Sequence, residues 1–187
     1  LQAEDGIRDE ASCLVGSEMC IRDSRRTGAV GGSFRWVAAD LTRRGPLSGG
    51  ADFDLVALFG VLHHVPGFRG RARLLRQAAE RLEPGGSLLV SLWRFRDEPR
   101  IVARAIPRSR AARLVGLAEG ELDLEPGDAF LRWGPSGGDW PCRYCHHVGA
   151  HEADRLWREA GVRPYWEGVA DGPSGRSNHY LALRRAD

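Results

Sequence analysis

Two nearly continuous apolar runs stand out in the chain, at residues 53–60 (FDLVALFG) and 87–93 (SLLVSLW). Such runs are typical of strands that are covered on both faces. Between them, apolar residues recur with helical spacing over 74–82, and the segment Pro84, Gly85 and Gly86 is expected to end that helix. A strand, a helix and a strand joined by short links predict a βαβ unit, in which the two strands lie side by side and run parallel.

The pattern loosens in the middle of the chain. Apolar positions predict one amphipathic helix over 101–106, ended near Pro107, and a second short helix around 114–117. The remainder of residues 97–141 is expected to form loops. A long insertion after a strand is typical of a lid-like segment that contacts substrate.

The C-terminal part again alternates between helix and strand. A helix is predicted over 153–160, ended by Gly161, and two strands are predicted at 163–170 and 177–185, around the turn DGPSGR. A further short strand is predicted at 33–40 (SFRWVAAD). These elements predict an α/β fold, with a Rossmann-like, doubly wound, mostly parallel sheet and a C-terminal antiparallel strand pair.

The first 24 residues, LQAEDGIRDEASCLVGSEMCIRDS, differ in character from the rest. They contain the only Met and two of the four Cys, and they show neither helical nor strand periodicity. The segment resembles the read-through translation of sequencing-library adapter, and a disordered native tail is the alternative. We therefore expect residues 1–24 to be non-native or disordered, and residues 25–187 to form a partial domain that is incomplete at its N-terminus.

Charge and composition narrow the classes of function. All 27 basic residues are Arg, and the formal net charge is +2. Residues 1–24 hold two of these Arg and six of the 25 acids, so the remainder has 25 Arg against 19 acids, a net charge of +6. This balance permits an RNA partner without requiring one. No apolar run reaches the ~18 residues of a membrane helix, and no secretory signal is visible. We expect a cytoplasmic protein with no membrane partner, and the oligomeric state stays open.

The ordered set VAAD … FDLVALFGVLHHV … LLRQAAERLEPGGSLLVSLW resembles the class I S-adenosylmethionine-dependent methyltransferases over about residues 33–185. The resemblance implies an enzyme that transfers a methyl group from S-adenosylmethionine, its cofactor. Ligands of open α/β sheets lie beyond the carboxyl ends of the strands. The residues that the resemblance implies for cofactor binding are Asp40, Leu41, Phe59, Gly60, Val61 and His64.

Each of these residues has an implied role. The carboxylate of Asp40 would accept a hydrogen bond from the adenine amino group, with the backbone of Leu41 beside the ring. Phe59, Gly60 and Val61 would line the methionine part of the cofactor, where a glycine lets the backbone approach closely. A histidine in the turn of His63 and His64 packs near the sulfonium or caps the next element. Catalytic and structural roles therefore both stay open for the two histidines.

One part of the family pattern is missing. In the family, the first strand ends in a glycine-rich loop that cradles the cofactor, and an acid that ends the second strand binds the ribose. Both features should precede Asp40 by tens of residues. The glycines of TGAVGGSF lead into a strand instead of following one, which is typical of a turn. We therefore expect a truncated domain that binds the cofactor weakly or not at all and is inactive alone.

The motif WPCRYCHHV has three interpretations. Cys142, Cys145 and His146 satisfy the C-x-x-C-H pattern of haem attachment. The two cysteines with His147 or His151 offer ligands for zinc, which His63 or His64 could join. Haem attachment takes place after export, and structural zinc usually needs two ligand pairs. A zinc- or haem-binding module is therefore kept as the alternative from a different class of function, and no metal is expected.

The third interpretation is substrate contact, because the motif and the helix after it resemble the tail of the tRNA wobble-uridine carboxymethyl methyltransferases. Trp133 would be the family's loop tryptophan, and Arg143, Tyr144 and His146 match its Arg-Tyr-aromatic-His run, with Cys145 in place of the aromatic residue. The resemblance implies that Arg143 grips a carboxylate or a phosphate. Tyr144 or Trp133 would stack on a flipped-out base, and His146 would donate a hydrogen bond to the uracil or ribose.

These resemblances lead to a functional prediction. The expected reaction is methylation of the carboxylate of a carboxymethyl-modified uridine in tRNA, and a small-molecule acceptor is the alternative. A carboxylate is already ionised at pH 7, so the enzyme must chiefly align the reacting atoms. The candidate catalytic residues are His64, Arg143 and His146.

Overall fold

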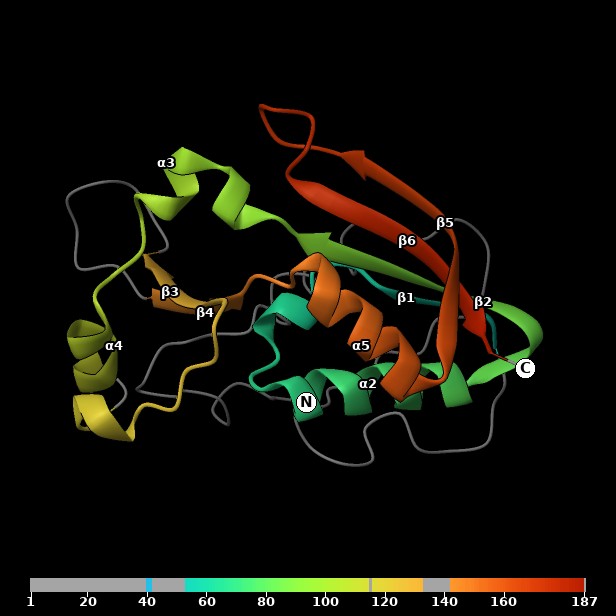
Figure 1. The fold of residues 1–187 in the computed structure, drawn as a ribbon, viewed down its shortest axis with the longest axis horizontal. Coiled ribbons are helices and arrows are strands. Elements are labelled where there is room, and N and C mark those ends of the chain that lie inside the picture. The colour runs from blue at the N-terminus through green and yellow to red at the C-terminus, as the bar shows by residue number, and fades with distance from the viewer. Residues whose placement is uncertain (1–39, 42–52, 115, 133–141, 187) are drawn as a thin grey trace, which may run out of the picture.

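The two long apolar runs form neighbouring parallel strands, as the sequence predicts. The computed structural model describes residues 40–41, 53–114, 116–132 and 142–186. In it, β1 (Phe53–Leu58) pairs in parallel with β2 (Leu82–Trp93), and the chain between them forms α2 (Phe68–Glu80). In Figure 1, α2 lies below the two strands. The carboxyl ends of both strands therefore lie at the same edge of the sheet.

Strand β2 begins five residues earlier than the apolar run that predicted it. Phe53 pairs with Leu82, but Leu55 pairs with Ser87, so β2 bulges between these two points. The bulge contains Pro84, which has no N–H to donate to a ladder. The expected role of this Pro-Gly-Gly segment as a helix stop was wrong, because α2 already ends at Glu80.

The C-terminal hairpin completes the sheet, and its prediction is confirmed. β6 (Asn178–Arg185) runs antiparallel to β2, and β5 (Val162–Ala170) runs antiparallel to β6, giving the order β1-β2-β6-β5. The expectation of a mostly parallel sheet was wrong for the described residues, because only the pairing of β1 with β2 is parallel. The strand expected at 33–40 lies outside the described residues, except for Asp40.

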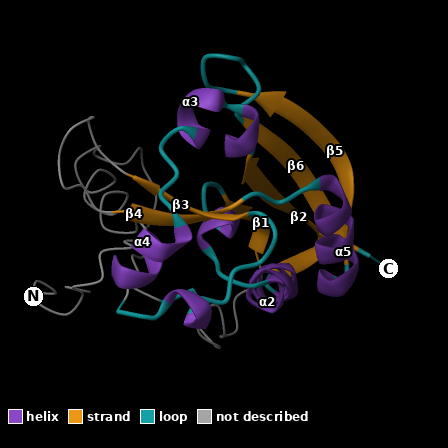
Figure 2. Cartoon of the chain, turned by 60° about the vertical axis from the view of Figure 1, so that its left-hand side comes forward, coloured by secondary structure: helices purple, strands orange, loops and turns teal. Residues whose placement is uncertain are grey.

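Both long helices cover the same face of the sheet. Helix α5 (Ala150–Ala160) lies beside α2, and both pack on one hydrophobic core (Figures 1 and 2). Gly161 ends α5 in the left-handed region at φ 67°, as predicted. In the described residues the sheet is thus wound on one face only, and the doubly wound arrangement is not seen there. The central core residues are Leu74, Leu75, Leu88, Val90, Leu156, Trp157, Leu181 and Leu183.

A second, two-stranded sheet joins the insertion to the CRYCH motif that follows it. Its strands β3 (Asp128–Arg132) and β4 (Cys142–His146) are antiparallel, and β3 lies where the sequence predicted a loop. The helix expected over 101–106 is shorter, because Ala105 forms a bridge to Leu131 and extends beside β3. The short elements are η1 (Leu62–His64), η2 (Phe95–Asp97), α3 (Pro99–Val102), α4 (Arg108–Leu114) and η3 (Glu119–Glu121).

No helix among the described residues is long and apolar enough to span a membrane.

Candidate functional site

The carboxyl end of β1 leads into a tight turn. Gly60 adopts φ 69°, a conformation that favours glycine, and its N–H donates to the Ser91 hydroxyl on β2 at 2.9 Å. Phe59 is 54% exposed and makes an edge-on ring contact with Tyr180. Val61 is half-buried. The turn therefore presents an aromatic side chain and a backbone without a Cβ at the edge of the sheet.

Asp40 and Leu41 are the described residues that precede β1. Asp40 is exposed, and Leu41 is half-buried and packs against the main core. Their proposed contacts with the adenine ring stay predictions.

Two buried histidines follow the turn. The rings of His63 and His64 lie 4.2 Å apart, and the ring of His63 lies 5.3 Å from that of Trp93, at the end of β2. Burial, and then the charges of His64 and Arg143, lower the pKa of His63 to about 3. Nδ1 of His63 is buried without a hydrogen-bond partner among the described residues. His63 is therefore a neutral imidazole at pH 7.

His64 is held in one tautomer. Its Nδ1 lies 2.8 Å from the carbonyl oxygen of Tyr144, and a carbonyl can only accept, so Nδ1 carries the proton. Burial lowers the pKa of His64, although this hydrogen bond acts in the other direction. Nε2 of the neutral ring therefore keeps a free lone pair.

Strand β4 turns alternate side chains of the CRYCH motif to opposite faces. Cys145 packs with Phe95 and Leu131, whereas Cys142 packs in a different cluster, with Ala111 and Phe130. Burial raises the pKa of the Cys145 thiol to about 12, which disfavours the thiolate that a metal binds. The two cysteines of a C-x-x-C pair on a strand point to opposite faces, so they cannot bind the same ion. The geometry therefore disagrees with the zinc and haem alternatives.

The same alternation separates the predicted substrate residues. Arg143 shares the Cys145 face, and its charge helps to lower the pKa values of both His63 and His64. Tyr144 and His146 lie on the other face. Trp133 lies outside the described residues. The structure thus brings His64 and Arg143 together near the ends of β1 and β2, and it turns Tyr144 and His146 away from them.

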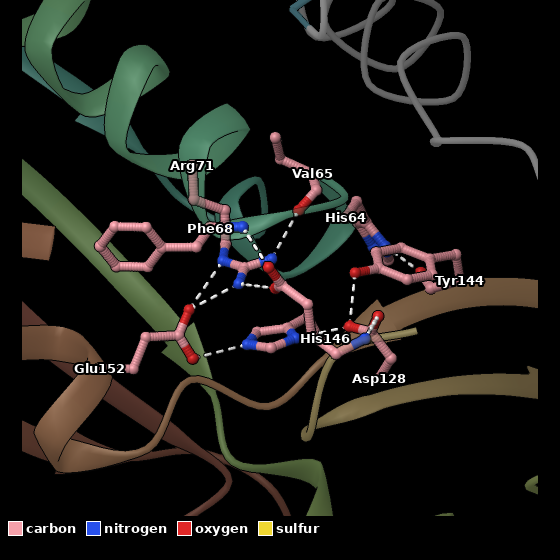
Figure 3. Close-up of polar contacts among 9 residues, drawn as sticks. His64, Val65, Phe68, Arg71, Asp128, Tyr144, His146 and Glu152 are labelled. Atoms are coloured by element: carbon pink, nitrogen blue, oxygen red, sulfur yellow. Dashed lines mark hydrogen bonds and ion pairs between the residues drawn. The ribbon is translucent and has the colours of Figure 1, made fainter. Parts of the chain in front are cut away.

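The other face of β4 borders a network of buried ionic groups (Figure 3). The guanidinium of Arg71, on α2, is fully buried and lies 2.5 Å from Glu125 and 2.6 Å from Glu152. It also donates to the carbonyl of Val65 at 3.1 Å. Glu125 in addition accepts the N–H of Phe68 at 2.8 Å, at the beginning of α2. A carboxylate at this helix end is favoured by the helix dipole.

His146 joins this network through both ring nitrogens. Nδ1 lies 2.6 Å from Asp128, and Nε2 lies 2.7 Å from Glu152. Burial alone would lower the pKa of His146, but the hydrogen bonds to the two carboxylates raise it. Because carboxylates only accept, both nitrogens must donate, and His146 is an imidazolium. We call this group the buried clamp; it comprises Arg71, Glu125, Asp128, Tyr144, His146 and Glu152.

The clamp includes three groups that could hold a metal ion. Ligand atoms of Glu125, His146 and Glu152 lie within 4.8 Å of one another. However, Arg71 already binds both glutamates, and both nitrogens of His146 are occupied. The arrangement is therefore that of an ion-pair network.

A cavity of about 460 Å³ lies among η2, the insertion helices and β3, and two ring contacts connect its lining to the histidine pair. Phe95 lines it and also contacts the ring of Trp93 at 5.3 Å, and Trp93 in turn contacts His63. Its walls are mostly apolar, and the charged residues Arg96, Arg108 and Asp128 also line it. The apolar lining residues are Val102, Ala105, Ile106, Leu124, Phe130 and Leu131.

Sequence reasoning missed the clamp. One signal was available, because Arg71 lies three and four residues before Leu74 and Leu75, on the apolar stripe of α2. A charged residue on that stripe requires buried partners. The partners could not be found in this way, since Glu125 and Glu152 are 54 and 81 residues away in sequence.

Comparison with known proteins points to one family. The model of the family described as "Methyltransferase domain" matches residues 14–90, which include β1, α2 and most of β2. The match begins inside the segment 1–24, whose adapter origin stays a prediction. No curated protein matches the sequence.

Solved structures share the fold at low sequence identity. An S-adenosylmethionine-dependent methyltransferase from Methanosarcina mazei has a TM-score of 0.59 and 16% identity, covering 90% of this chain and 77% of that one. The CcbJ methyltransferase from Streptomyces caelestis has a TM-score of 0.51 and 17% identity, with coverages of 81% and 63%. This chain therefore spans less than two thirds of the CcbJ chain.

A third structure contains ligands. The 1,6-didemethyltoxoflavin-N1-methyltransferase from Burkholderia thailandensis, solved with 1,6-didemethyltoxoflavin and S-adenosylhomocysteine, has a TM-score of 0.51 and 18% identity. The coverages are 82% of this chain and 51% of that one. The family match over residues 14–90 and the shared fold both agree with the resemblance to class I S-adenosylmethionine-dependent methyltransferases found in the sequence.

Proposed function

We propose that the full-length protein transfers a methyl group from S-adenosylmethionine to a small-molecule acceptor held beside His64 and Arg143. One observation supports this most strongly. Two neutral imidazoles and a guanidinium gather near the carboxyl ends of the parallel strands β1 and β2, the edge at which open α/β sheets bind ligands.

The residues at this edge fit one side of the cofactor. Gly60 has no Cβ and has open space where one would project, and Phe59 beside it is exposed. Phe59, Gly60 and Val61 would lie along the methionine part, and Asp40 and Leu41 would contact the adenine. The bound cofactor would supply an electrophilic methyl group.

The histidine pair would handle the proton of the acceptor. A hydroxyl or amine acceptor loses a proton as it is methylated, and a neutral imidazole can take it up. His64 is suited to this role because its Nε2 has a free lone pair while Tyr144 fixes its Nδ1 proton. Arg143 would bind an anionic part of the acceptor, where a guanidinium offers paired donors.

The acceptor class is supported by the cavity and by one neighbour. A volume of about 460 Å³ with apolar walls suits a small ring compound. The Burkholderia thailandensis enzyme was solved with such a compound, 1,6-didemethyltoxoflavin. Two arginines, Arg96 and Arg108, line the cavity, and the one acid in its lining, Asp128, is already paired with His146, so an acceptor with negative charge is favoured.

A carboxymethyluridine in tRNA is the second candidate, and Arg143 is the observation that favours it. The roles predicted for Tyr144 and His146 gain no such support, because their side chains hydrogen-bond within the clamp. For a carboxylate acceptor no base would be needed, and Arg143 would matter more than His64.

Radiolabelled methyl transfer by the full-length protein would test both candidates, with a pool of small aromatic acids, phenols and amines in one arm and bulk tRNA in the other. We expect label in the small-molecule arm. His64→Gln should lower the rate by about 100-fold or more for a hydroxyl or amine acceptor. Arg76→Gln, an exposed change on α2, is the control and should stay within about twofold. Label in neither arm would contradict the proposal, and label in tRNA alone would favour the second candidate.

A further inference from the structure

We propose that Arg71 and His146 are positioning residues, which hold β4 so that Arg143 and the Tyr144 carbonyl face the ends of β1 and β2. A catalytic effect of Arg71 and His146 rests on the proposed function. Their effect on the position of β4 does not depend on it.

The clamp connects the insertion to the core of the domain. Arg71 comes from α2 and Glu152 from α5, and both helices pack on the main sheet. Asp128 and His146 come from β3 and β4, which form a sheet of their own. Glu125, just before β3, binds Arg71 and the first N–H of α2. The side chains of the clamp thus join two helices of the core to two strands that, within the described part of the chain, share no backbone ladder with the main sheet.

Tyr144 links the clamp to the histidine pair. Its hydroxyl donates to Asp128 at 2.6 Å, while its carbonyl accepts from Nδ1 of His64 at 2.8 Å. The first bond fixes the tyrosine against the clamp, and the second fixes the ring of His64. A shift of β4 relative to α2 and α5 would therefore change the hydrogen bond that sets the tautomer of His64.

The position of His146 excludes direct contact with substrate. Its side chain is 1% exposed, and both ring nitrogens are bound to carboxylates. The charged groups around it are Arg71 from α2, Glu152 from α5, Glu125 and Asp128 from the insertion, with the phenol of Tyr144 and the neutral ring of His147 from β4 and its end. An imidazolium here adds a charged donor to two carboxylates that also accept from Tyr144 and Arg71.

Nitrogen-15 NMR of the histidine side chains in the full chain tests the proposal without any need for activity. At pH 7 we expect His146 to show two protonated nitrogens, and His64 to show one neutral tautomer, protonated at Nδ1. In Arg71→Met and His146→Gln, His64 should change to a mixture of tautomers. Arg71→Lys keeps the charge and should keep most of the wild-type His64 signal, and Arg76→Met is the matched control on the exposed face of α2.

Several results would overturn the proposal. A neutral His146 in the wild-type chain would do so directly, whether or not any variant folds. Folded Arg71→Met or His146→Gln with unchanged His64 signals would show that the clamp stabilises the fold without positioning the site. Tyr144→Phe removes only the hydroxyl link to Asp128, and it should shift the His64 tautomer balance partly; an unchanged balance counts against the proposal. If the wild-type protein and the variants give the expected NMR signals but the wild-type protein transfers no methyl group, the proposed function fails and the positioning stands.

Discussion

His63 and His146 lie on opposite sides of β4, and their charge states differ although both are buried. Their exposed fractions are 6% and 1%. On the His63 side the neighbours are aromatic rings, a second imidazole and a guanidinium, so burial lowers the pKa without opposition. On the His146 side, Asp128 and Glu152 outweigh burial and raise the pKa. Hydrogen-bond partners, more than depth, decide the charge of a buried histidine here.

The two sides also differ in how completely their polar atoms are bonded. Every member of the clamp has a hydrogen-bond partner, whereas Nδ1 of His63 and Nδ1 of His147 have none among the described residues. An unsatisfied buried polar atom costs about 1–3 kcal/mol. Such a cost is more typical of a functional site than of a structural one. The comparison agrees with the proposed division, in which the clamp stabilises the fold and the histidine pair takes part in the chemistry.

Removing the central cation of the clamp should have the largest effect. Arg71→Met leaves Glu125 and Glu152 partly buried without their cation, and we expect a loss of about 3–5 kcal/mol in the free energy of unfolding. Urea denaturation of the chain measures this. The matched change Arg76→Met breaks a pair with Glu159 in which both side chains are about half exposed, so it should cost less than about 1 kcal/mol. Equal losses in the two variants would show that the clamp is no stronger than a surface pair.

The neutral histidines should make the fold sensitive to acid. The pKa of His63 falls from 6.5 to about 3 on folding, so its contribution is complete above pH 6.5 and is lost as the pH falls from there. The loss is about 1.4 kcal/mol per pH unit for one proton. His146, with a raised pKa, acts in the opposite sense: its contribution is complete below pH 6.5 and is lost as the pH rises through its folded-state value.

The variant His63→Phe keeps a ring against Trp93, but this ring has no nitrogen that can take up a proton. Between pH 6.5 and 4.5, wild-type stability should fall by about 2–3 kcal/mol more than that of His63→Phe, as measured by urea denaturation at both values. This range lies above the lowered pKa values of Asp128 and Glu152, so the clamp carboxylates stay ionised. Parallel losses in the two proteins would mean that His63 is protonated in the fold.

The parts of the fold that sequence patterns predict are those whose pattern is local. The apolar runs of β1 and β2, the stripe of α5 and the turn of the C-terminal hairpin each lie within one short window, and all were found. Strand β3 was missed because DAFLR is short and its partner lies beyond residues 133–141. The bulge of β2 was missed because Pro and Gly beside a helix also predict a helix end.

Only part of the candidate site could be predicted from the sequence, because its residues come from distant segments of the chain. His64 and Arg143 were named from a resemblance, and the structure brings them together. Tyr144 and His146 were named with them as one group, but neighbours on a strand point to opposite faces. Treating CRYCH as a strand would have separated them before any coordinates were known. The ionic partners of Arg71 and His146 could not have been predicted, since no local pattern joins α2, β3 and α5.

Within the clamp, the tyrosine hydroxyl should contribute a moderate share. Tyr144→Phe removes one hydrogen bond to an ionised carboxylate, Asp128, and we expect a loss of about 1–2 kcal/mol in the free energy of unfolding. Burial and then Asp128 raise the pKa of this phenol well above its ordinary value. Ultraviolet absorbance should therefore show one tyrosine that does not ionise until the chain unfolds in alkali. Ionisation of all three tyrosines near pH 10 in the folded wild type would contradict the bond.

The cysteine pair should show the smallest effect, and it tests whether the two faces of β4 are separate. Cys142 packs as a small apolar group with Ala111 and Phe130, so Cys142→Ala should cost about 1 kcal/mol. Because Cys145 lies in a different cluster, the combined variant Cys142→Ala with Cys145→Ala should lose the sum of the two single losses, within about 0.5 kcal/mol. Added zinc should not raise the melting temperature of the wild type. A zinc-dependent rise in the melting temperature that each single variant abolishes would show that the two thiols bind one ion. The side chains of β4 could then not alternate between two faces, and Arg143 would not be separated from the clamp.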